Sequence, residues 1–336
     1  MYDSGRDTGP NALKNPGGST SSRTKSFFQD GVWLYGGGPG TLARPLSPDT
    51  LAASHPLWAA DVARLAPWRE VLLGAEAGPA AGTWYVSEAL RTISPICILG
   101  ECDSSLDAAW KLDEAALLPP FSSVLAVNQR QGRGQLRREW SSPAGNIYAA
   151  WLLPEAPDEQ IASMAPVLVG ACLADALVEK GFPASVKWPN DLLLDGSKVG
   201  GILLEERNGH TIAGIGLNCA SAPDAADLRR DHAIAATLLQ AFGSVPGTIT
   251  LWVGLVQSGQ TCYRHSVMLS DTAERTRLAS RHMAWIGRNV LVRDAETDGF
   301  VARIIGLAED GGLRLRRVDP LPGQELTLHC GSISLL

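Results

Sequence analysis

The sequence predicts an α+β protein in which strands and helices are mixed and a small all-β region follows. Three observations support this prediction. An apolar pattern with helical spacing covers residues 163–180, short strands follow in quick succession between residues 186 and 217, and glycine-punctuated strands begin near residue 283. With 336 residues and 45% apolar content, the chain is long enough for two or three compact domains, each with a hydrophobic core.

Charge and composition argue against several classes of protein. Asp and Glu outnumber Lys and Arg by 35 to 29, and the net charge of −6 is unlike that of a protein whose main partner is a nucleic-acid backbone. We find no run of about 20 uninterrupted apolar residues, so no membrane span is expected. Residues 1–26 are polar and lack the apolar core of a secretory signal.

The cysteines and histidines do not form metal-ligand patterns. The six histidines are scattered, and the six cysteines contain no CxxC pair. We therefore expect no structural metal, and we expect reduced thiols in a cytoplasmic protein. The cysteines are Cys97, Cys102, Cys172, Cys219, Cys262 and Cys330.

The first part of the chain divides into a polar tail and a packed segment. Residues 1–26 are rich in Gly, Ser, Thr, Asn and Pro, which predicts disorder. Four tryptophans between residues 27 and 92 indicate packing, but the role of this segment stays open. Residues 59–73 have helical spacing, although Pro67 would break or kink the helix. The GGGPG run at residues 36–40 lacks the GK[ST] of a P-loop, and we interpret it as an ordinary loop.

The middle of the chain contains the clearest elements. Residues 163–180 predict a buried helix with Ser163 as N-cap and Gly181 as the stop signal. Asp195-Gly196 and Asn208-Gly209 predict tight hairpin turns between short strands. The expected strands are 123–127, 147–153, 186–188, 192–194, 199–205 and 211–217, and further helices are expected at 106–112, 223–242 and 251–266.

The last 54 or so residues predict a small antiparallel barrel, because short strands alternate there with glycine turns. The expected strands are 290–292, 300–305, 313–317, 325–329 and 333–335.

The run GRGQLRREW at residues 132–140 has the composition of an anion-binding loop. Gly132 and Gly134 allow backbone N–H groups to approach a ligand, and Arg133 can hold a carboxylate or phosphate with its planar guanidinium. Trp140 offers a flat face on which a purine can stack. Solvated arginines are the ordinary alternative, but the combination favours a nucleotide phosphate.

A second group of candidates lies around residues 187–201. Asp191, in the turn KWPND, is a candidate ligand of the Mg²⁺ that usually accompanies nucleotide phosphates, although such turns are often simple punctuation. Lys198 precedes Gly200 and Gly201, which leave the sheet bare of side chains so that a ligand can lie against the backbone. A lysine in that place can stabilise charge that develops on a reacting carboxylate and phosphate.

Ser104, Ser105 and Asn218 are weaker candidates. The two serines can bind a polar head group, or they can cap the helix expected at 106–112. Asn218 can face a nucleotide, or it can satisfy backbone groups at the end of a strand.

These motifs, in this order and spacing, resemble the biotin protein ligases. The motifs are DSS, QRQGRGQLRREWSSPAGNIY, VKWPNDLLLDGSKVGGILLE and GIGLN, and KWPND followed by KVGG is the strongest of them. The resemblance covers residues 93–218 and, more loosely, the region from residue 283, which is similar to the family's SH3-like cap domain. It implies a class II synthetase-like catalytic domain with a mixed or antiparallel central sheet packed against helices. The implied domains are residues 93–282 and 283–336, after a tail at 1–26 and a segment at 27–92.

The resemblance implies a two-step reaction with biotin and ATP as substrates and Mg²⁺ as the accompanying ion. Biotin is activated as biotinyl-AMP, and a lysine of a carboxylase carrier domain then displaces AMP. A Gly/Arg loop that orders over the intermediate would shield it from water.

The resemblance also assigns roles to individual residues. Lys198 and Arg133 are catalytic, and Asp191 is the magnesium candidate. Biotin contacts are implied for Ser104, Ser105, Leu106, Gln129, Arg133, Gly134, Gln135, Lys198, Gly200 and Gly201. Nucleotide contacts are implied for Arg138, Trp140, Asn190 and Asn218.

The chain departs from the family pattern in two places. Gln135 and Leu136 replace arginines of the usual GRGRRGR loop, and Arg137 replaces a glycine, which affects how the adenylate is retained. Leu106 replaces the asparagine of the usual DSTN, which removes an amide from the biotin pocket.

Two other functions compete with biotin ligation. A lipoate or octanoate ligase would share the architecture, and a non-catalytic biotin- or nucleotide-binding regulator is compatible with the altered loop. We expect no operator binding, because residues 1–92 show neither two adjacent short helices nor a basic face. An exposed strand is a candidate for pairing with the carrier or with a second copy in a homodimer.

Overall fold

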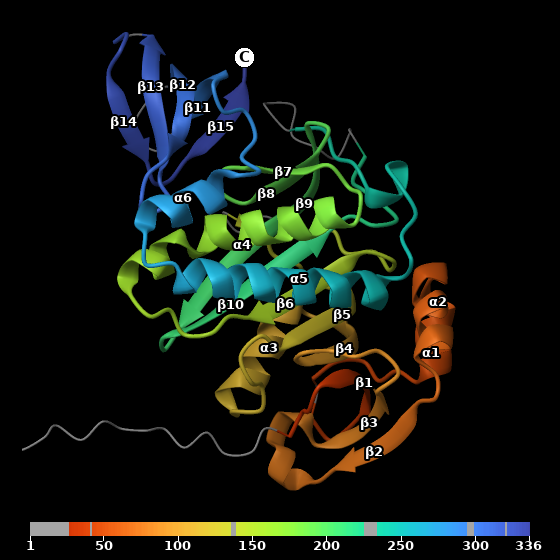
Figure 1. Cartoon of the computed structure of the whole chain (residues 1–336). Helices are drawn as coiled ribbons and strands as arrows, with labels where there is room; N and C mark the ends of the chain where they lie inside the picture. Colours follow the sequence, from red (N-terminus) through yellow and green to blue (C-terminus); the bar gives the residue numbers. More distant parts are fainter. Residues whose placement is uncertain (1–26, 41, 136–138, 225–233, 294–298, 320) are drawn as a thin grey trace, which may run out of the picture.

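The computed structural model describes residues 27–40, 42–135, 139–224, 234–293, 299–319 and 321–336. These residues form one ten-stranded mixed sheet flanked by helices and a separate five-stranded antiparallel sheet (Figure 1). The predicted α+β class with a large central sheet is therefore confirmed. The disorder predicted for residues 1–26 lies outside the described residues.

The large sheet has the strand order β2-β3-β1-β4-β5-β6-β10-β9-β8-β7. Strand β1 pairs with β4 and β4 pairs with β5 in parallel, and the other neighbours are antiparallel. The bounds are β1 Gly31–Gly37, β2 Arg69–Leu73, β3 Gly82–Ser87, β4 Pro95–Cys102, β5 Ser123–Gln129, β6 Ile147–Leu152, β7 Ala184–Lys187, β8 Asp191–Leu194, β9 Ser197–Arg207 and β10 His210–Leu217. Strands β1, β2 and β3 thus extend the sheet from the segment at 27–92. The domain boundary predicted at residue 93 falls between β3 and β4 and stays a prediction.

Alternating residues of the strands pack against helices on opposite faces of the sheet, as β-strand geometry requires. Leu125 of β5 belongs to the core beneath helices α4 (Glu159–Glu179) and α5 (Thr248–Met268). Its neighbour Val124 belongs to the core beneath helix α3 (Ser105–Glu114). The sheet is therefore covered by α4 and α5 on one face, as Figure 1 shows, and by α3 on the other.

Helix α4 begins earlier than the sequence predicted. Asp158 is the N-cap and accepts a hydrogen bond from Ile161 N at 2.8 Å, whereas the predicted cap, Ser163, donates from Oγ to Glu159 O. The cap prediction was wrong because aspartate caps as well as serine does, and the buried Ile161 already belongs to the apolar face of the helix. Gly181 follows the helix with φ +86°, which agrees with the predicted stop.

The same helix meets the length and mean hydropathy of a membrane span, although polar residues interrupt its apolar run. In the structure, 72% of its most apolar window is buried inside the protein. A core helix packed between sheet and helix has the same composition as a span, so this resemblance is weak evidence for a membrane.

The helix predicted at residues 59–73 was wrong in its second half. Helix α2 covers Pro56–Leu65, and Arg69–Leu73 form β2 after Ala66-Pro67. Helix α1 (Pro48–Ser54) precedes α2 directly, so residues 1–92 do contain two adjacent short helices, contrary to prediction. Proline at the first position and capping by Ser47 explain why α1 forms before α2.

The predicted helix at 251–266 is confirmed as α5, while the helix at 223–242 was wrong over its described part. Residues 234–238 are not helical, and Leu239–Ala241 form a single 3₁₀ turn. Residues 225–233 lie outside the described residues. Helix α6 (Thr272–Ser280) was not predicted.

Both predicted hairpin turns are confirmed. Asp195 and Gly196 have φ angles of 45° and 76°, and Asn208 and Gly209 have 52° and 79°, as two-residue hairpin turns require. The smaller sheet has the order β14-β13-β12-β11-β15. Its strands are β11 Asn289–Arg293, β12 Phe300–Leu307, β13 Leu313–Asp319, β14 Glu325–Leu328 and β15 Ser332–Leu335.

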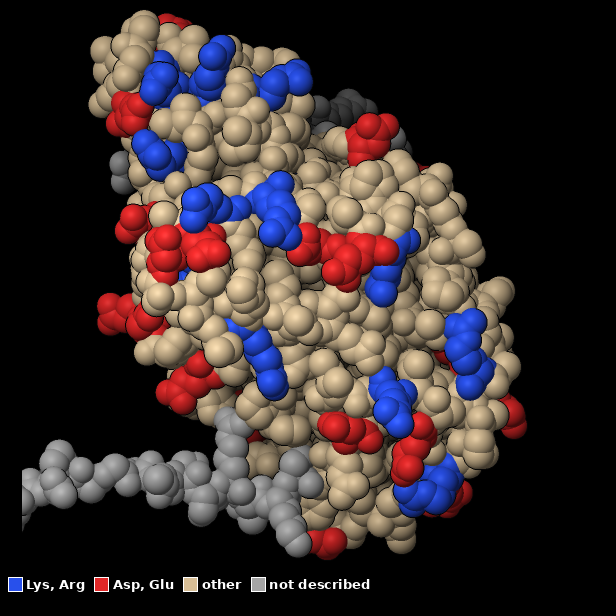
Figure 2. Space-filling model, viewed as in Figure 1, with Lys and Arg blue, Asp and Glu red and all other residues tan. Residues whose placement is uncertain are grey.

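Acidic and basic side chains are intermixed over the face of the molecule that Figure 2 shows. All six cysteines are free thiols. Within the described ranges, the structure places no three His, Cys, Asp or Glu side chains where they could hold a metal ion together.

Candidate functional site

The site that the sequence predicted at Lys198, Gly200 and Gly201 is built on the antiparallel pair β9 and β10. Gly201 of β9 lies opposite Gly216 of β10. A Cβ added at Gly216 would lie 2.5 Å from the ring of Trp140, and one added at Gly201 would lie 3.2 Å from it. The two glycines therefore allow the indole to lie directly against the backbone of the sheet.

Lys198 lies beside this indole and pairs with Asp191. Its Nζ is 2.5 Å from Asp191 Oδ1 and 5.5 Å from the centre of the Trp140 ring. The other carboxylate oxygen, Asp191 Oδ2, is 3.0 Å from Nζ of Lys187. Burial raises the pKa of Asp191, but the two ammonium groups outweigh it and hold the pKa below its ordinary value. One carboxylate and two lysines leave a net positive charge.

Two buried N–H donors at the site have no acceptor among the described residues. They are Nε1 of Trp140 and Nε of Arg133. Buried donors in folded proteins are nearly always hydrogen-bonded, so each unsatisfied one needs an explanation. Neither Trp140 nor Arg133 lines the cavity beside α3, so an acceptor oxygen of a ligand would reach these donors only after the side chains move.

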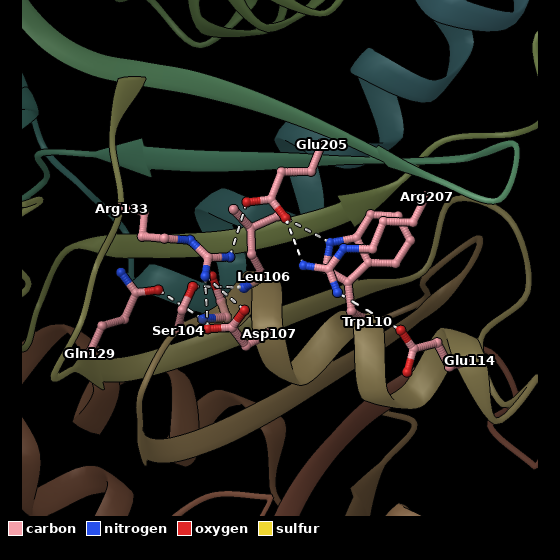
Figure 3. Close-up of polar contacts among 10 residues, drawn as sticks. Ser104, Leu106, Asp107, Trp110, Glu114, Gln129, Arg133, Glu205 and Arg207 are labelled. Carbon is pink, nitrogen blue, oxygen red and sulfur yellow. Dashed lines mark hydrogen bonds and ion pairs between the residues drawn. The ribbon is translucent and has the colours of Figure 1, made fainter. Parts of the chain in front are cut away.

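The terminal nitrogens of Arg133 are engaged by protein carboxylates, as Figure 3 shows. Nη1 is 2.8 Å from Asp107 of α3, and Nη2 is 3.0 Å from Glu205 of β9. The guanidinium fork that the sequence assigned to a ligand anion therefore binds the protein itself, and only Nε is left. In this arrangement, Arg133 anchors its loop to both α3 and β9.

Glu205 connects this anchor to a second arginine. Trp110 Nε1 donates to Glu205 Oε2 at 2.9 Å, and Arg207 Nη2 is 3.2 Å from the same oxygen (Figure 3). The guanidinium of Arg207 lies over the Trp110 ring at 4.7 Å. These residues were not predicted from the sequence, because each contact joins positions that are far apart in the chain and no local motif predicts such a contact.

The two serines and Gln129 form a connected group at the start of α3. Ser104 Oγ accepts a hydrogen bond from Leu106 N at 3.2 Å, so Ser104 is the N-cap. Gln129 Oε1 accepts from Ser105 N at 2.8 Å, and Gln129 Nε2 donates to Ser142 Oγ at 3.0 Å. These contacts are the capping alternative left open by the sequence, and they place the group next to the Arg133 anchor.

Leu106, which replaces the family's asparagine, packs on the sheet. A Cβ at Gly214 of β10 would lie 2.7 Å from Leu106 Cδ1. The leucine is buried and belongs to the core beneath α3. The predicted biotin pocket is therefore apolar at Leu106.

Other candidates make contacts with the backbone. Asn190 Nδ2 donates to Ile202 O at 2.7 Å, and Asn218 Nδ2 donates to Thr237 O at 3.1 Å. Gln135 is exposed and Gly134 is half-buried. Arg138, assigned to the nucleotide, lies outside the described residues.

The segment at 27–92 borders the site, which the sequence did not indicate. Arg44 N donates to Glu101 O at 2.8 Å, so the loop after β1 is bound to the end of β4. Ala43 of this loop packs in one cluster with Trp140. A cavity of about 430 Å³ lies between this loop and the start of α3, where Ser104 and Asp107 form part of its lining.

Comparisons with known proteins agree with the resemblance found in the sequence. Residues 99–220 match the biotin/lipoate A/B protein ligase family. The biotin--[acetyl-CoA-carboxylase] ligase of Paracoccus denitrificans is 40% identical over 136 residues, which are 38% of this chain and 56% of that protein. The bifunctional ligase/repressor BirA of Bacillus subtilis is 28% identical over 208 residues, 59% of this chain and 62% of that protein.

The fold is similar to that of a solved ligase. The biotin protein ligase from Aquifex aeolicus, in complex with biotin and ATP, superposes with a TM-score of 0.58 at 24% identity, covering 72% of this chain and 98% of that chain. At that identity, the likeness shows the fold alone. The chain spans 56% and 62% of the length of the two curated relatives above. Residues 99–220 carry a domain of the biotin/lipoate ligase family.

Proposed function

From the family domain at residues 99–220, we propose that this protein attaches biotin to a lysine of a carboxylase carrier domain at the expense of ATP. In the first step, a carboxylate oxygen of biotin attacks the α-phosphorus of ATP, a phosphorus–oxygen bond forms, and pyrophosphate leaves. In the second step, the carrier's lysine amine attacks the acyl carbon and AMP leaves. The carboxylate needs this activation because it is otherwise inert to amines.

The observation that carries the proposal is the position of the Lys198 ammonium beside two bare glycines and a flat indole. In the structure the Trp140 indole lies along Gly201 and Gly216, so an extended acyl chain takes this strip of bare backbone only when the indole moves away. A cation at the end of that strip stabilises negative charge that develops between carboxylate and phosphate, and it does so most strongly where water is excluded. After the side chains move, the buried donors on Trp140 and Arg133 supply further contacts for those oxygens.

Arg133 would act in this proposal mainly by positioning its loop. Because Asp107 and Glu205 compensate its charge, it contributes less net attraction for an anion than a free arginine would. Its bridge between α3 and β9 keeps the glycine-flanked loop next to the acyl site. A loop held there excludes water from the reactive acyl-adenylate.

Asp191 does not fit the role of a protein ligand for Mg²⁺. Both of its oxygens are paired with lysines, at 2.5 Å and 3.0 Å. Mg²⁺ in nucleotide sites is commonly held by substrate phosphates with one or two carboxylates. In our proposal, the ion arrives with ATP, and Asp191 instead orients Lys198.

Pyrophosphate release with biotin, lipoate and octanoate as competing acids tests the choice of substrate. We expect release with biotin, because a ureido ring needs matched hydrogen bonds that a dithiolane or an alkyl chain would leave unpaired. Release of pyrophosphate with lipoate or octanoate, and not with biotin, would mean that the protein activates that acid instead of biotin. Binding of biotin without transfer of label to a carrier domain would favour a non-catalytic regulator.

We propose ligase activity without operator binding, although the Bacillus subtilis relative is named a bifunctional ligase/repressor. Helices α1 and α2 are adjacent, but α2 buries Leu57, Trp58, Asp61 and Leu65. Its one basic residue, Arg64, donates to Thr250 Oγ1 of α5 at 2.7 Å. A recognition helix would instead present a free polar face to the major groove.

We further propose that the five-stranded sheet is the SH3-like domain that the resemblance implies. Its strands alternate inward and outward, with Val290, Val292, Ile304 and Leu315 buried. Trp188 Nε1 donates to Gly311 O at 3.0 Å and joins this sheet to the turn before β8.

Strand β2 is the candidate for docking of the carrier or of a second copy. It lies at the edge of the large sheet, and its Leu72 is 77% exposed. We assign the reaction to the cytoplasm, where cysteine thiols are ordinarily kept reduced and disulfides are transient.

A further inference from the structure

Two cysteines meet between the helices that cover one face of the sheet. Cys172 of α4 and Cys262 of α5 have their sulfur atoms 2.6 Å apart. Among the described residues, this is the one pair of thiols in contact, and the remaining cysteines Cys97, Cys102, Cys219 and Cys330 are separate. The contact plays no part in the proposed ligase reaction.

We propose that Cys172 and Cys262 form a reversible oxidation site that closes an intramolecular disulfide between α4 and α5. A disulfide bond is about 2.05 Å long, so the sulfurs need to approach each other by only roughly 0.6 Å. Such a shift is within the reach of small side-chain rotations. The two residues are 90 positions apart, so the bond would join distant parts of the chain.

The two thiols have different roles because their surroundings differ. Cys172 is 0% exposed, whereas Cys262 is partly accessible from outside. The hydrogen bond that Cys172 donates to Cys262 Sγ lowers the pKa of Cys262, and burial raises the pKa of Cys172. Arg281 also favours the Cys262 thiolate, and Asp175 opposes it. Cys262 is therefore the thiol that reacts first, and Cys172 resolves the product.

A low-molecular-weight disulfide such as oxidised glutathione supplies the oxidising equivalents. The Cys262 thiolate attacks one glutathione sulfur, a sulfur–sulfur bond forms, and one glutathione thiolate leaves. Cys172 then loses its proton to that leaving thiolate and attacks Cys262 Sγ, which expels the second glutathione. Two cysteines are oxidised, and one glutathione disulfide is reduced to two thiols.

Peptide mapping of the full chain tests the proposal without any variant. Trypsin places the two cysteines on different peptides, residues 139–180 and 231–264, and each contains one cysteine. After native incubation with oxidised glutathione and alkylation, we expect these peptides to be joined, with the loss of two hydrogens, and to separate after reduction. The joined protein should also melt at a higher temperature than the reduced one, because the crosslink restricts the unfolded chain.

Three outcomes would overturn the site. The first is that both thiols remain alkylatable under conditions that convert the exposed Cys330 to its glutathione adduct. The second is that Cys262 stops at the glutathione adduct. The third is that Cys172→Ser, which removes the resolving thiol, still shows the rise in melting temperature. Cys219→Ser is the matched control, because Cys219 is buried and its thiol donates to Leu217 O instead of contacting the pair, so the joined peptides 139–180 and 231–264 should form as in the parent chain.

Discussion

Nζ of Lys198 lies 2.5 Å from Oδ1 of Asp191, while the second oxygen of the same carboxylate binds Lys187 at 3.0 Å. One carboxylate thus orients two ammonium groups, and only that of Lys198 lies over the Trp140 indole. This asymmetry assigns the two lysines different roles, which substitution can separate.

We expect Lys198→Ala to slow formation of the acyl-adenylate by about 10²-fold or more, the scale for losing a preorganised charge stabiliser. The variant should still fold, because the Lys198 side chain is 31% exposed and Lys187 still pairs with the Asp191 carboxylate. Single-turnover release of pyrophosphate measures the rate, and circular dichroism checks the fold.

Lys187→Ala is the matched control for that prediction. This variant also removes one partner of Asp191. The ammonium group that it removes, however, lies 6.0 Å from the centre of the Trp285 ring and not beside Trp140 and the glycines that it covers. We expect a loss of less than about tenfold, equivalent to about 1.4 kcal/mol. Equal losses in both variants would mean that the lysines act only by neutralising Asp191.

The hairpin that carries Lys198 could be predicted from the sequence because its geometry is local, whereas the ion pair with Asp191 was not predicted, since Asp191 was assigned to Mg²⁺. Asp195-Gly196 closes a two-residue hairpin, and this turn brings β8 and β9 together so that Asp191 and Lys198 meet across it. Gly200 and Gly201 follow on the same strand. Turn chemistry and strand alternation act over a few residues, so a single sequence reveals them.

The Arg133 anchor could not be predicted in the same way. Its partners, Asp107 and Glu205, are 26 and 72 residues away in the chain. The same limit explains the segment at 27–92, whose strands join the main sheet through the parallel pairing of β1 with β4. Such pairings depend on tertiary packing, and no local pattern specifies them.

We expect Glu205→Gln to let the acyl-adenylate escape into solution faster than in the parent chain. The change removes the charge that binds Nη2 of Arg133 and weakens the hold of β9 on the loop. Arg133→Ala, which removes the whole anchor, should give an equal or larger effect. The ratio of free to protein-bound adenylate in a chase experiment without carrier measures the escape.

Glu206→Gln is the control for this prediction, since Glu206 is exposed on the same strand. Its adenylate should escape at the parental rate. If Glu205→Gln also retains the adenylate normally, then the Glu205 salt bridge does not hold the loop; normal retention by Arg133→Ala as well would place Arg133 among the ordinary surface arginines.

Asp61 is a buried carboxylate that joins the segment at 27–92 to α5. It accepts hydrogen bonds from Ile249 N at 2.5 Å, Thr250 N at 3.1 Å and Thr250 Oγ1 at 2.6 Å. We expect Asp61→Ala to lower the free energy of unfolding by about 2–3 kcal/mol, because it removes a helix cap and leaves buried donors unpaired. Urea unfolding measures the loss. Asp49→Ala, at an exposed position in α1, should change the value by less than about 0.5 kcal/mol.

The acid dependence of stability should report the ion pairs of Asp191. Two neighbouring ammonium groups hold its pKa in the folded protein below the ordinary value of 3.8. An acid with a depressed folded pKa stabilises the protein at pH values above its unfolded pKa, and this contribution is lost as the pH falls through the folded pKa. The advantage of the parent chain over Asp191→Asn should therefore be largest above about pH 5 and should shrink below 3.8, by at most about 1.4 kcal/mol per pH unit. Urea unfolding of both chains between pH 2 and 6 measures this difference, and Asp49→Asn, at an exposed position, serves as the control that should show little change. A difference that stays constant or widens towards acid would mean that the carboxylate is not held ionised by Lys187 and Lys198, and it would remove the electrostatic basis for the orientation of Lys198.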